Sequence, residues 1–211
     1  MKLAVFSESS ADEAAVRILT EGVLGRQTTS ISGPPIRARG WPSVRGVLPS
    51  LIRHLHYQTD AEGLILVIDS NHSPIHQPAH DVPAGADKDC RFCLVSLTVD
   101  QVQSALRSVH GRTAIKIAIG LAVPCIEAWY LCGLDPHVSE AAWARGLVSR
   151  QLPYSGKELK RRAYGTDRPS LSLETDRARA EAQRLAHNCE ILESNFPNGF
   201  GALARRLRTW K

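Results

Sequence analysis

The chain has 211 residues, of which 43% are hydrophobic and 22% are charged. This composition is ordinary for a packed globular protein and excludes a disordered or fibrous chain. No apolar run approaches the length of a transmembrane helix, about 18 residues, and the N-terminus lacks the apolar segment of a secretory signal. We therefore expect a cytoplasmic protein.

The formal net charge of +5 is distributed unevenly along the chain. Residues 145–211 contain 14 Lys and Arg against 7 acids, whereas residues 1–144 contain 12 against 14. A neutral to acidic front and a basic tail suit a carboxylate site that is served by a phosphate-binding surface. The alternative interpretation is a solvated charged surface without a ligand.

The first part of the chain predicts a strand, a helix and a second strand. Residues 2–6 form a short apolar run that is typical of a buried strand. Ser9 or Ser10 is a suitable N-cap for the helix that follows, and Gly25 is a suitable end for it. A second, brief strand is predicted over residues 28–32.

A Gly/Pro/Arg-rich loop over residues 33–42 leads to a helix that we expect to begin at Ser43. Residues 63–69 are the clearest strand of the chain, because a continuous apolar run there ends in an aspartate. Residues 70–91 are rich in His, Pro, Asp and Gly and show no periodicity. This segment predicts a long loop, which in a compact domain is usually functional or mobile.

The second half begins with a helix predicted over residues 100–110 and a strand predicted over residues 114–123. Pro124 then precedes a helix over residues 125–134. The remainder is polar and helical. Its predicted helices lie near residues 138–148, 157–163, 174–193 and 199–210.

The alternation of strands and helices predicts an α/β fold with an open, mainly parallel sheet of about four strands. Residues 1–135 would form this Rossmann-like core, including the long His/Cys loop over residues 70–93. Residues 136–211 would form a helical, basic extension that packs on the core. We expect a single domain overall.

Two of the predicted strands run into an acidic residue, Glu8 after the first strand and Asp69 at the end of the third. In open α/β sheets, ligands bind outside the carboxyl ends of the strands. If these two strands are neighbours, both carboxylates reach the same crevice, where their oxygens suit a hard cation such as Mg²⁺. The alternative is that both acids only cap a helix or face solvent.

Three short motifs resemble the Toprim (topoisomerase–primase) superfamily. Ser7-Glu8-Ser9-Ser10 resembles its glutamate motif, and Leu66-Val67-Ile68-Asp69-Ser70-Asn71 resembles its strand-ending DxD motif. Val123–Leu131 resembles the P-x-x-E-x-W-x-L helix start of small bacterial Toprim-like families, which are often found beside ATPases in phage-defence neighbourhoods. Phe196–Trp210 is similar to their closing helix.

This resemblance implies a Toprim-like nuclease that cuts phosphodiester bonds of DNA or RNA with Mg²⁺ or Mn²⁺. Glu8 would act as general acid/base or metal ligand, Asp69 as the principal metal ligand, and Glu127 as an additional acid. Asn71 replaces the second acid of DxD, so it would coordinate through its carbonyl oxygen without adding a charge. The missing charge would weaken metal binding.

The resemblance also implies a role as an effector in anti-phage defence with a partner ATPase. The chain has no G-x-x-x-x-G-K-[ST] sequence, so that ATPase would be a separate protein. Two other functions stay open. One is phosphoryl or nucleotidyl transfer on a small nucleotide, and the other is a catalytically weakened module that binds nucleic acid or a partner protein without cleavage.

The long loop carries a second candidate metal site. His76-x₃-His80-x₉-Cys90-x₂-Cys93 has the ligand types and the Cys spacing that Zn²⁺ accepts, in the reverse order of the usual zinc finger. A structural zinc would explain how a loop without periodicity stays ordered; the alternative is a polar loop with two ordinary thiols. His72, three residues after Asp69, is a secondary candidate for metal binding or proton transfer.

Basic residues supply a candidate surface for nucleic acid. Lys157, Lys160 and Arg161 have the i, i+3 and i+4 spacing of one helical face. Together with Arg37 and Arg39 they could contact a nucleic-acid backbone, and such contacts would be independent of sequence and sensitive to salt. The oligomeric state stays open, with a homodimer as one option.

Overall fold

The computed structural model describes residues 1–31, 40–81 and 87–210. Within these residues, parallel strands form one four-stranded sheet in the order β2-β1-β3-β4. The strands are β1 (Lys2–Phe6), β2 (Thr29–Ser30), β3 (Gly63–Asp69) and β4 (Lys116–Ala122). The predicted α/β class with an open parallel sheet is confirmed, and the arrangement is Rossmann-like.

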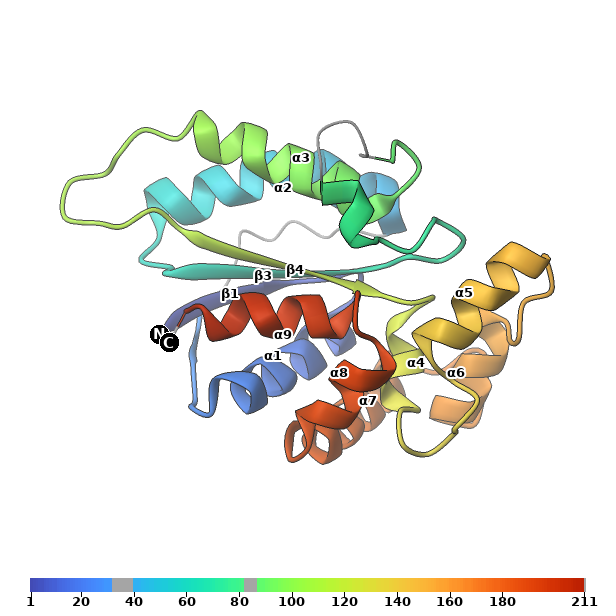
Figure 1. The fold of residues 1–211 in the computed structure, drawn as a ribbon. Coiled ribbons are helices and arrows are strands. Elements are labelled where there is room, and N and C mark those ends of the chain that lie inside the picture. Colours follow the sequence, from blue (N-terminus) through green and yellow to red (C-terminus); the bar gives the residue numbers. More distant parts are fainter. Residues whose placement is uncertain (32–39, 82–86, 211) are drawn as a thin grey trace.

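Helices cover both faces of the sheet (Figure 1). The helices α2 (Gly40–Gln58) and α3 (Arg91–Ser104) lie on one face, and α1 (Ser10–Leu24) and α9 (Phe200–Arg208) lie on the other. Because both faces are covered, β3 is buried from its first residue to its sixth. This burial explains why its sequence is continuously apolar rather than alternating.

The remaining helices complete the C-terminal half of the chain and the loop after β3. They are the 3-10 helix η1 (Pro78–Asp81), α4 (Ile126–Tyr130), α5 (Glu140–Ser149), α6 (Gly156–Tyr164), α7 (Leu171–Ala186) and α8 (Cys189–Asn195). Helix α7 lies along α1, and α9 packs on β4, so the C-terminal helices contact the N-terminal half. Within the described segments, no helix combines the length and the apolar character that crossing a bilayer requires.

Helix α1 has the boundaries that its sequence predicts. Ser9 is the N-cap, and its hydroxyl accepts a hydrogen bond from the backbone N–H of Asp12 at 3.1 Å. Gly25 ends the helix with φ 65°, a left-handed conformation that glycine adopts without a steric penalty. Ala15 and Leu19, one turn apart, are buried against the sheet layer. The helix is therefore fixed at both ends.

The helix predicted over residues 100–110 is wrong in its position. Helix α3 begins at Arg91, nine residues earlier than the prediction, and ends at Ser104. Val95, Val99 and Val102 lie on its buried face at helical spacing. The prediction placed residues 70–91 in a loop because they are rich in His, Pro, Asp and Gly and show no periodicity.

Other predicted boundaries also differ. Helix α2 begins at Gly40 instead of Ser43 and carries Pro42 in its first turn, where a missing backbone N–H costs little. The helix predicted over residues 125–134 is shorter, because α4 ends at Tyr130 and turns follow. The segment near 174–193 contains two helices, α7 and α8, separated by a turn.

Strand β4 lies at the edge of the sheet, and side chains meet two outward carbonyl groups there, one on the residue before the strand and one within it. Gln103 Nε2 donates a hydrogen bond to the carbonyl oxygen of Ile115 at 3.0 Å. Arg206 Nε donates to the carbonyl oxygen of Ile117 at 3.3 Å. The two donors come from α3 and α9, so each face of the sheet contributes one of these bonds.

A buried carboxylate joins α5 to the turn before α9. The side chain of Glu140 is buried and accepts hydrogen bonds from the backbone N–H and side-chain amide of Asn198, and from the backbone N–H of Gly199 at 2.9 Å. Gly199 in turn lies against β4, where a Cβ atom would come within 2.2 Å of the carbonyl oxygen of Leu121. Glu140 therefore holds the backbone that α9 needs to reach the sheet.

Glu140→Ala should lower the free energy of unfolding by about 2 kcal/mol, because it removes a charged acceptor from several N–H donors at once. Urea denaturation monitored by circular dichroism measures the difference. Glu190→Ala, which removes an exposed acid on α8, is the matched control and should change stability by less than about 0.5 kcal/mol. Equal effects of the two substitutions would contradict this account of the turn.

Candidate functional site

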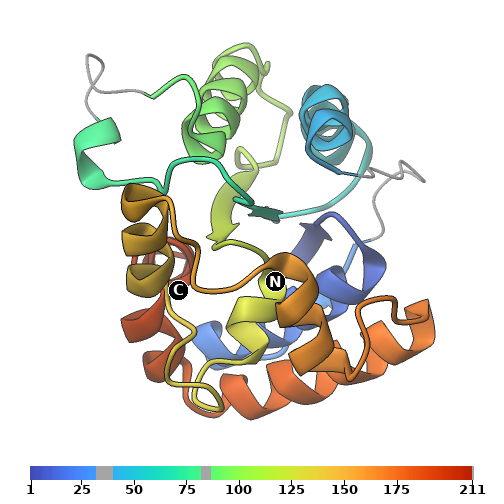
Figure 2. The same ribbon diagram turned by 90° about the vertical axis from the view of Figure 1, so that its right-hand side faces the viewer.

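The two acids predicted at the strand ends lie next to each other. Strands β1 and β3 are direct neighbours, with Phe6 paired to Leu66, so their carboxyl ends open at the same edge. Figure 2 looks toward this edge. The carboxylate of Glu8 accepts a hydrogen bond from the backbone N–H of Asp69 at 3.3 Å. The structure therefore brings the predicted pair together at the position that open α/β sheets use for ligands.

A backbone N–H at the start of α4 fixes the side chain of Asp69. Its Oδ1 atom accepts a hydrogen bond from the backbone N–H of Ile126, at the start of α4, at 3.1 Å. The backbone N–H groups of Ser70 and Asn71 donate to carbonyl groups of the segment after β4, each at 2.7 Å. Burial raises the pKa of Asp69 well above its usual value, and the nearby carboxylates of Asp12, Glu127 and Glu8 raise it further.

Glu127 lies on α4 and is buried beside the two strand-end acids. The Tyr164 hydroxyl donates a hydrogen bond to its Oε1 atom at 3.3 Å, and Lys160 Nζ lies 3.7 Å from the same atom. Lys160 also lies 3.9 Å from a carboxylate oxygen of Glu174 on α7. Burial lowers the pKa of Lys160, but attraction to Glu127 and Glu174 outweighs burial, so its pKa is raised overall.

Asp12 is a member of this cluster that the sequence reading did not identify. It lies in the first turn of α1, and the Tyr130 hydroxyl donates to its Oδ1 atom at 3.5 Å. Burial raises the pKa of Asp12 to about 7, against the hydrogen bond with Ser9, and the carboxylate of Glu127 contributes to the rise. No local spacing signals this membership, because Glu8 precedes α1 whereas Asp12 lies in its first turn, and the two acids share a cluster only through the packing of α4 beside α1.

Negative charge exceeds positive charge in this acidic cluster, which we define as Glu8, Asp12, Asp69 and Glu127. Its neighbouring cations are Lys160 and Arg91. Arg91 Nη1 donates a hydrogen bond to the carbonyl oxygen of Asp69 at 2.7 Å. A concentrated excess of buried negative charge is relieved by protons or by a cation.

The His/Cys cluster in the loop after β3 forms as the sequence predicts. One ligand atom each of His76, His80, Cys90 and Cys93 lie within 4.8 Å of one another, so this cluster could bind a metal ion. His76 Nδ1 lies 3.9 Å from the Cys90 sulfur and 3.5 Å from the Cys93 sulfur. Among the described residues, the carboxylates of the acidic cluster do not form a comparable group, so they would have to rotate to share one ion.

Two further observations support a metal at the His/Cys cluster. His76 Nε2 lies 3.1 Å from Asp81 Oδ1, which is the carboxylate partner that commonly orients a metal-ligating histidine. His80 Nδ1 is buried and has no hydrogen-bond partner within the described residues. A buried ring nitrogen of this kind is satisfied when it coordinates a metal.

Several predicted residues make no side-chain hydrogen bond or ion pair with the acidic cluster within the described part of the chain. Asn71 has φ 50°, and its side chain is exposed. The ring of His72 lies 6.2 Å from that of Trp143 on α5. On α6, Lys157 is exposed, whereas Arg161 lies 3.6 Å from a carboxylate oxygen of Asp167. Two other predicted cations, Arg37 and Arg39, lie outside the described residues.

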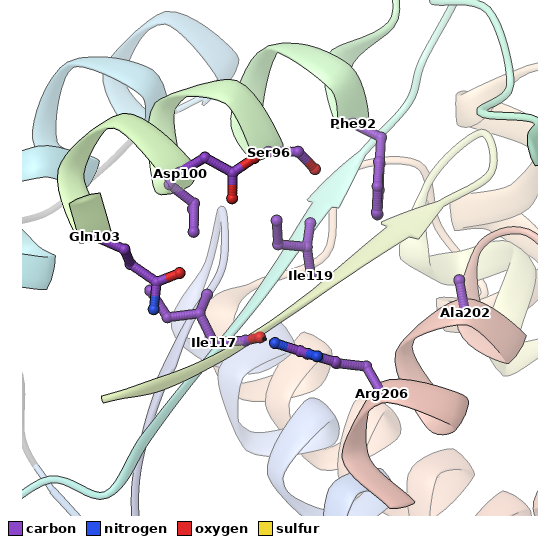
Figure 3. Close-up of a pocket in the computed structure, with 9 residues that line it drawn as sticks. Phe92, Ser96, Asp100, Gln103, Ile117, Ile119, Ala202 and Arg206 are labelled. Atoms are coloured by element: carbon purple, nitrogen blue, oxygen red, sulfur yellow. Dashed lines mark hydrogen bonds between the residues drawn. The ribbon is translucent and has the colours of Figure 1, made fainter. Parts of the chain in front are cut away.

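A cavity of about 210 Å³ lies at the edge of β4 between α3 and α9 (Figure 3). Ile117 and Ile119 of β4 line it, and Asp100 and Arg206 approach it from the two helices. None of the acidic-cluster residues lines this cavity. The cavity is therefore separate from the candidate site.

Asp12→Asn should remove part of the pH dependence of stability. With a raised pKa, the folded state holds a proton on Asp12 that the unfolded chain releases, so stability falls as pH rises from about 3.8 to about 7. In buffer without divalent cations, Asp12→Asn should raise the free energy of unfolding at about pH 8 by roughly 2–4 kcal/mol and flatten this decline. Urea denaturation at several pH values measures both effects.

Asp176→Asn, which alters an exposed acid on α7, is the control for the change in net charge. It should leave the pH profile of the unfolding free energy unchanged. A wild-type profile that stays flat or rises over the same pH range would overturn the assignment of a buried, protonated Asp12.

No protein-family model, no curated protein and no solved structure matches the chain. The function is therefore argued from the acidic cluster and the His/Cys cluster themselves.

Proposed function

We propose that the protein is a Toprim-type phosphodiesterase that hydrolyses DNA or RNA with Mg²⁺ or Mn²⁺. The observation that carries this proposal is the cluster of four carboxylates, one buried and three partly buried, at the carboxyl ends of two adjacent parallel strands. Asp69 supports it most directly, because burial and three neighbouring acids raise its pKa while a backbone N–H fixes its orientation. Phosphodiester hydrolysis is the chemistry that the order of the sequence motifs also implies.

The donor set fits a hard divalent cation, because the available ligands are carboxylate oxygens. Glu8 and Asp69 would hold the ion, and the side-chain carbonyl of Asn71 would be an additional ligand after a rotation of this exposed side chain. When bound, such an ion supplies charge neutralisation at a phosphate and a lowered pKa for a coordinated water.

The chain's own residues provide the proton chemistry. Asp12, with a pKa of about 7, can hold a proton at neutral pH and transfer it to a leaving oxygen. Glu127 is held in place by Tyr164 and Lys160, so it would act as a fixed negative charge near the site. Cys125 takes no part as a nucleophile, because burial raises the pKa of its thiol and keeps it protonated.

Exposed cations of α6 would contact the nucleic-acid backbone near this site. Lys157 is exposed at the start of the helix, and Arg161 is exposed one turn later. Lys160, between them, faces the acidic cluster instead, because it is paired with Glu127 and Glu174. We further propose that the protein acts in the cytoplasm as an effector of anti-phage defence, together with a separately encoded ATPase.

A second candidate function is a Toprim-like module that binds nucleic acid or a partner protein without cleavage. Two observations favour it. Asn71 supplies no charge where the superfamily has its second acid, and Lys160 already neutralises Glu127. A site with this charge balance would bind a divalent ion weakly.

Cleavage is the test of the first function. Plasmid DNA and single-stranded RNA incubated with the protein and Mg²⁺ or Mn²⁺ should be cut, as gel electrophoresis will show. Glu8→Gln and Asp69→Asn should each lower the rate by about 100-fold or more, because each removes a charge from the ion-binding oxygens. Glu190→Gln and Asp176→Asn, both exposed acids, are the matched controls and should cut at the wild-type rate.

Cleavage that persists unchanged in both strand-end variants would exclude the acidic cluster as the catalytic site. Salt-sensitive binding of nucleic acid without any cleavage would favour the second function.

For the His/Cys cluster we propose Zn²⁺ as the resident ion. Thiolate and imidazole donors in a four-residue set are the usual ligands of structural zinc, and the His76–Asp81 contact supplies the outer partner. The site is built from the loop after β3 and the first turn of α3, so a bound ion would fasten the loop to the helix.

Elemental analysis should find about one zinc per chain in the purified protein. Cys90→Ser and Cys93→Ser should each lose most of the zinc and lower the melting temperature by several degrees, because metal binding contributes to folding free energy. Cys189→Ser, a thiol on α8 outside the cluster, should keep both the zinc and the melting temperature. A protein purified without chelators that contains no zinc would refute the assignment.

A further inference from the structure

Arg91 lies between the two thiol ligands of the His/Cys cluster. Cys90 is the N-cap of α3, Arg91 is the first residue of the helix, and Cys93 lies in the first turn. A metal bound to both sulfurs therefore fixes the backbone on each side of Arg91. The ring of His76 stacks on Phe92 with centroids 4.2 Å apart, so the same turn is also packed against the loop.

From this turn, Arg91 reaches the acidic cluster. Its Nη1 atom donates to the carbonyl oxygen of Asp69 at 2.7 Å, and its guanidinium carbon lies 5.1 Å from the ring centroid of Trp41. The carboxylates of Glu8 and Asp69 both attract its charge. The side chain thus connects the His/Cys cluster to the end of β3 through one direct hydrogen bond.

Arg91 retains donors for a ligand. Within the described residues, its Nε and Nη2 atoms make no hydrogen bond, whereas Lys160 is engaged by Glu127 and Glu174 at 3.7 and 3.9 Å. A guanidinium group binds a phosphate through two parallel N–H donors, which an ammonium group cannot match. Arg91 is therefore the cation beside the strand-end acids that is best suited to a phosphate.

We infer that Arg91 binds a phosphate of the nucleic-acid substrate and that the metal in the His/Cys cluster holds it in place for this contact. The inference rests on the proposed function, since it names the residue that brings the phosphate to the acidic cluster. The physical reason is preorganisation: an arginine on a fixed turn loses less conformational entropy on binding than one on a loose loop. Loss of the metal should therefore weaken nucleic-acid binding to the same degree as loss of the guanidinium group.

A double-mutant cycle tests this coupling. The dissociation constant of a fluorescent single-stranded DNA is measured by anisotropy in Ca²⁺, an ion that takes the same oxygen ligands, for the wild type, Arg91→Gln, Cys93→Ser and the double variant. Arg91→Gln should keep its zinc and bind about tenfold more weakly. Cys93→Ser should lose zinc and bind more weakly to a similar degree, and the double variant should be no weaker than either single one.

Cleavage in Mg²⁺ supplies an independent reading. For Arg91→Gln, KM should rise about tenfold while kcat changes little. The reason is that the lost phosphate contact stabilises the bound substrate and the transition state equally, so its loss weakens binding without slowing the chemical step. Arg91→Lys should restore part of the affinity but not all of it. Arg53→Gln, an exposed arginine on α2, and Cys189→Ser are the matched controls and should behave as wild type.

The coupling would be overturned if the dissociation constant of the double variant rose by the product of the two single fold-changes. A zinc-free Cys93→Ser protein that binds DNA with wild-type affinity would also overturn it. If Cys93→Ser does not fold, the wild type stripped of zinc by phenanthroline and then reloaded takes its place in the cycle. If the wild type binds and cuts DNA but the losses of affinity multiply in the double variant, only this inference is removed. A wild type that neither binds nor cuts removes the proposed function as well.

Discussion

The feature on which the candidate site depends is the mutual repulsion of carboxylates that the fold brings together at the buried ends of β1 and β3. Parallel neighbouring strands place Glu8 and Asp69 at one edge, and the first turn of α1 adds Asp12. In a low-dielectric surrounding such charges are costly unless they are protonated, hydrogen-bonded or paired. The surrounding structure supplies each of these in part, through the backbone N–H of Ile126, the hydroxyl of Tyr130 and a partial proton on Asp12.

The acidic cluster and the His/Cys cluster offer two different types of metal donor. Carboxylate oxygens select hard cations, which exchange readily, whereas thiolate and imidazole donors select zinc and hold it firmly. The loop after β3 connects the two, since it begins at Asp69 and leads to Cys90 and Cys93.

The sequence was most informative where chemistry and local pattern coincide. The strand ending at Asp69 and the His/Cys spacing could both be predicted, because each depends on residues close in the chain. The contact of Glu8 with Asp69 depends on the order of the strands in the sheet. Strand order is a long-range property, so the sequence predicted the contact only if the two strands were neighbours. Asp12 lies in the first turn of α1, where the helix dipole favours an acid. The packing of α4 and α6 beside this turn also makes Asp12 part of the acidic cluster, which local sequence does not show. The spacing of Lys160 from Lys157 and Arg161 predicts an exposed cation, but its ammonium group instead lies beside the buried carboxylate of Glu127.

The two side chains that bond to the outer carbonyl groups of Ile115 and Ile117 also bear on how copies of this protein could assemble. A strand from a second molecule that paired with β4 would displace the bonds from Gln103 and Arg206, and its own N–H groups would only replace what was lost. The net gain from extending the sheet at this edge would therefore be small. Association through the β4 edge, a usual route from an open sheet to a fibre or a continuous-sheet dimer, is disfavoured.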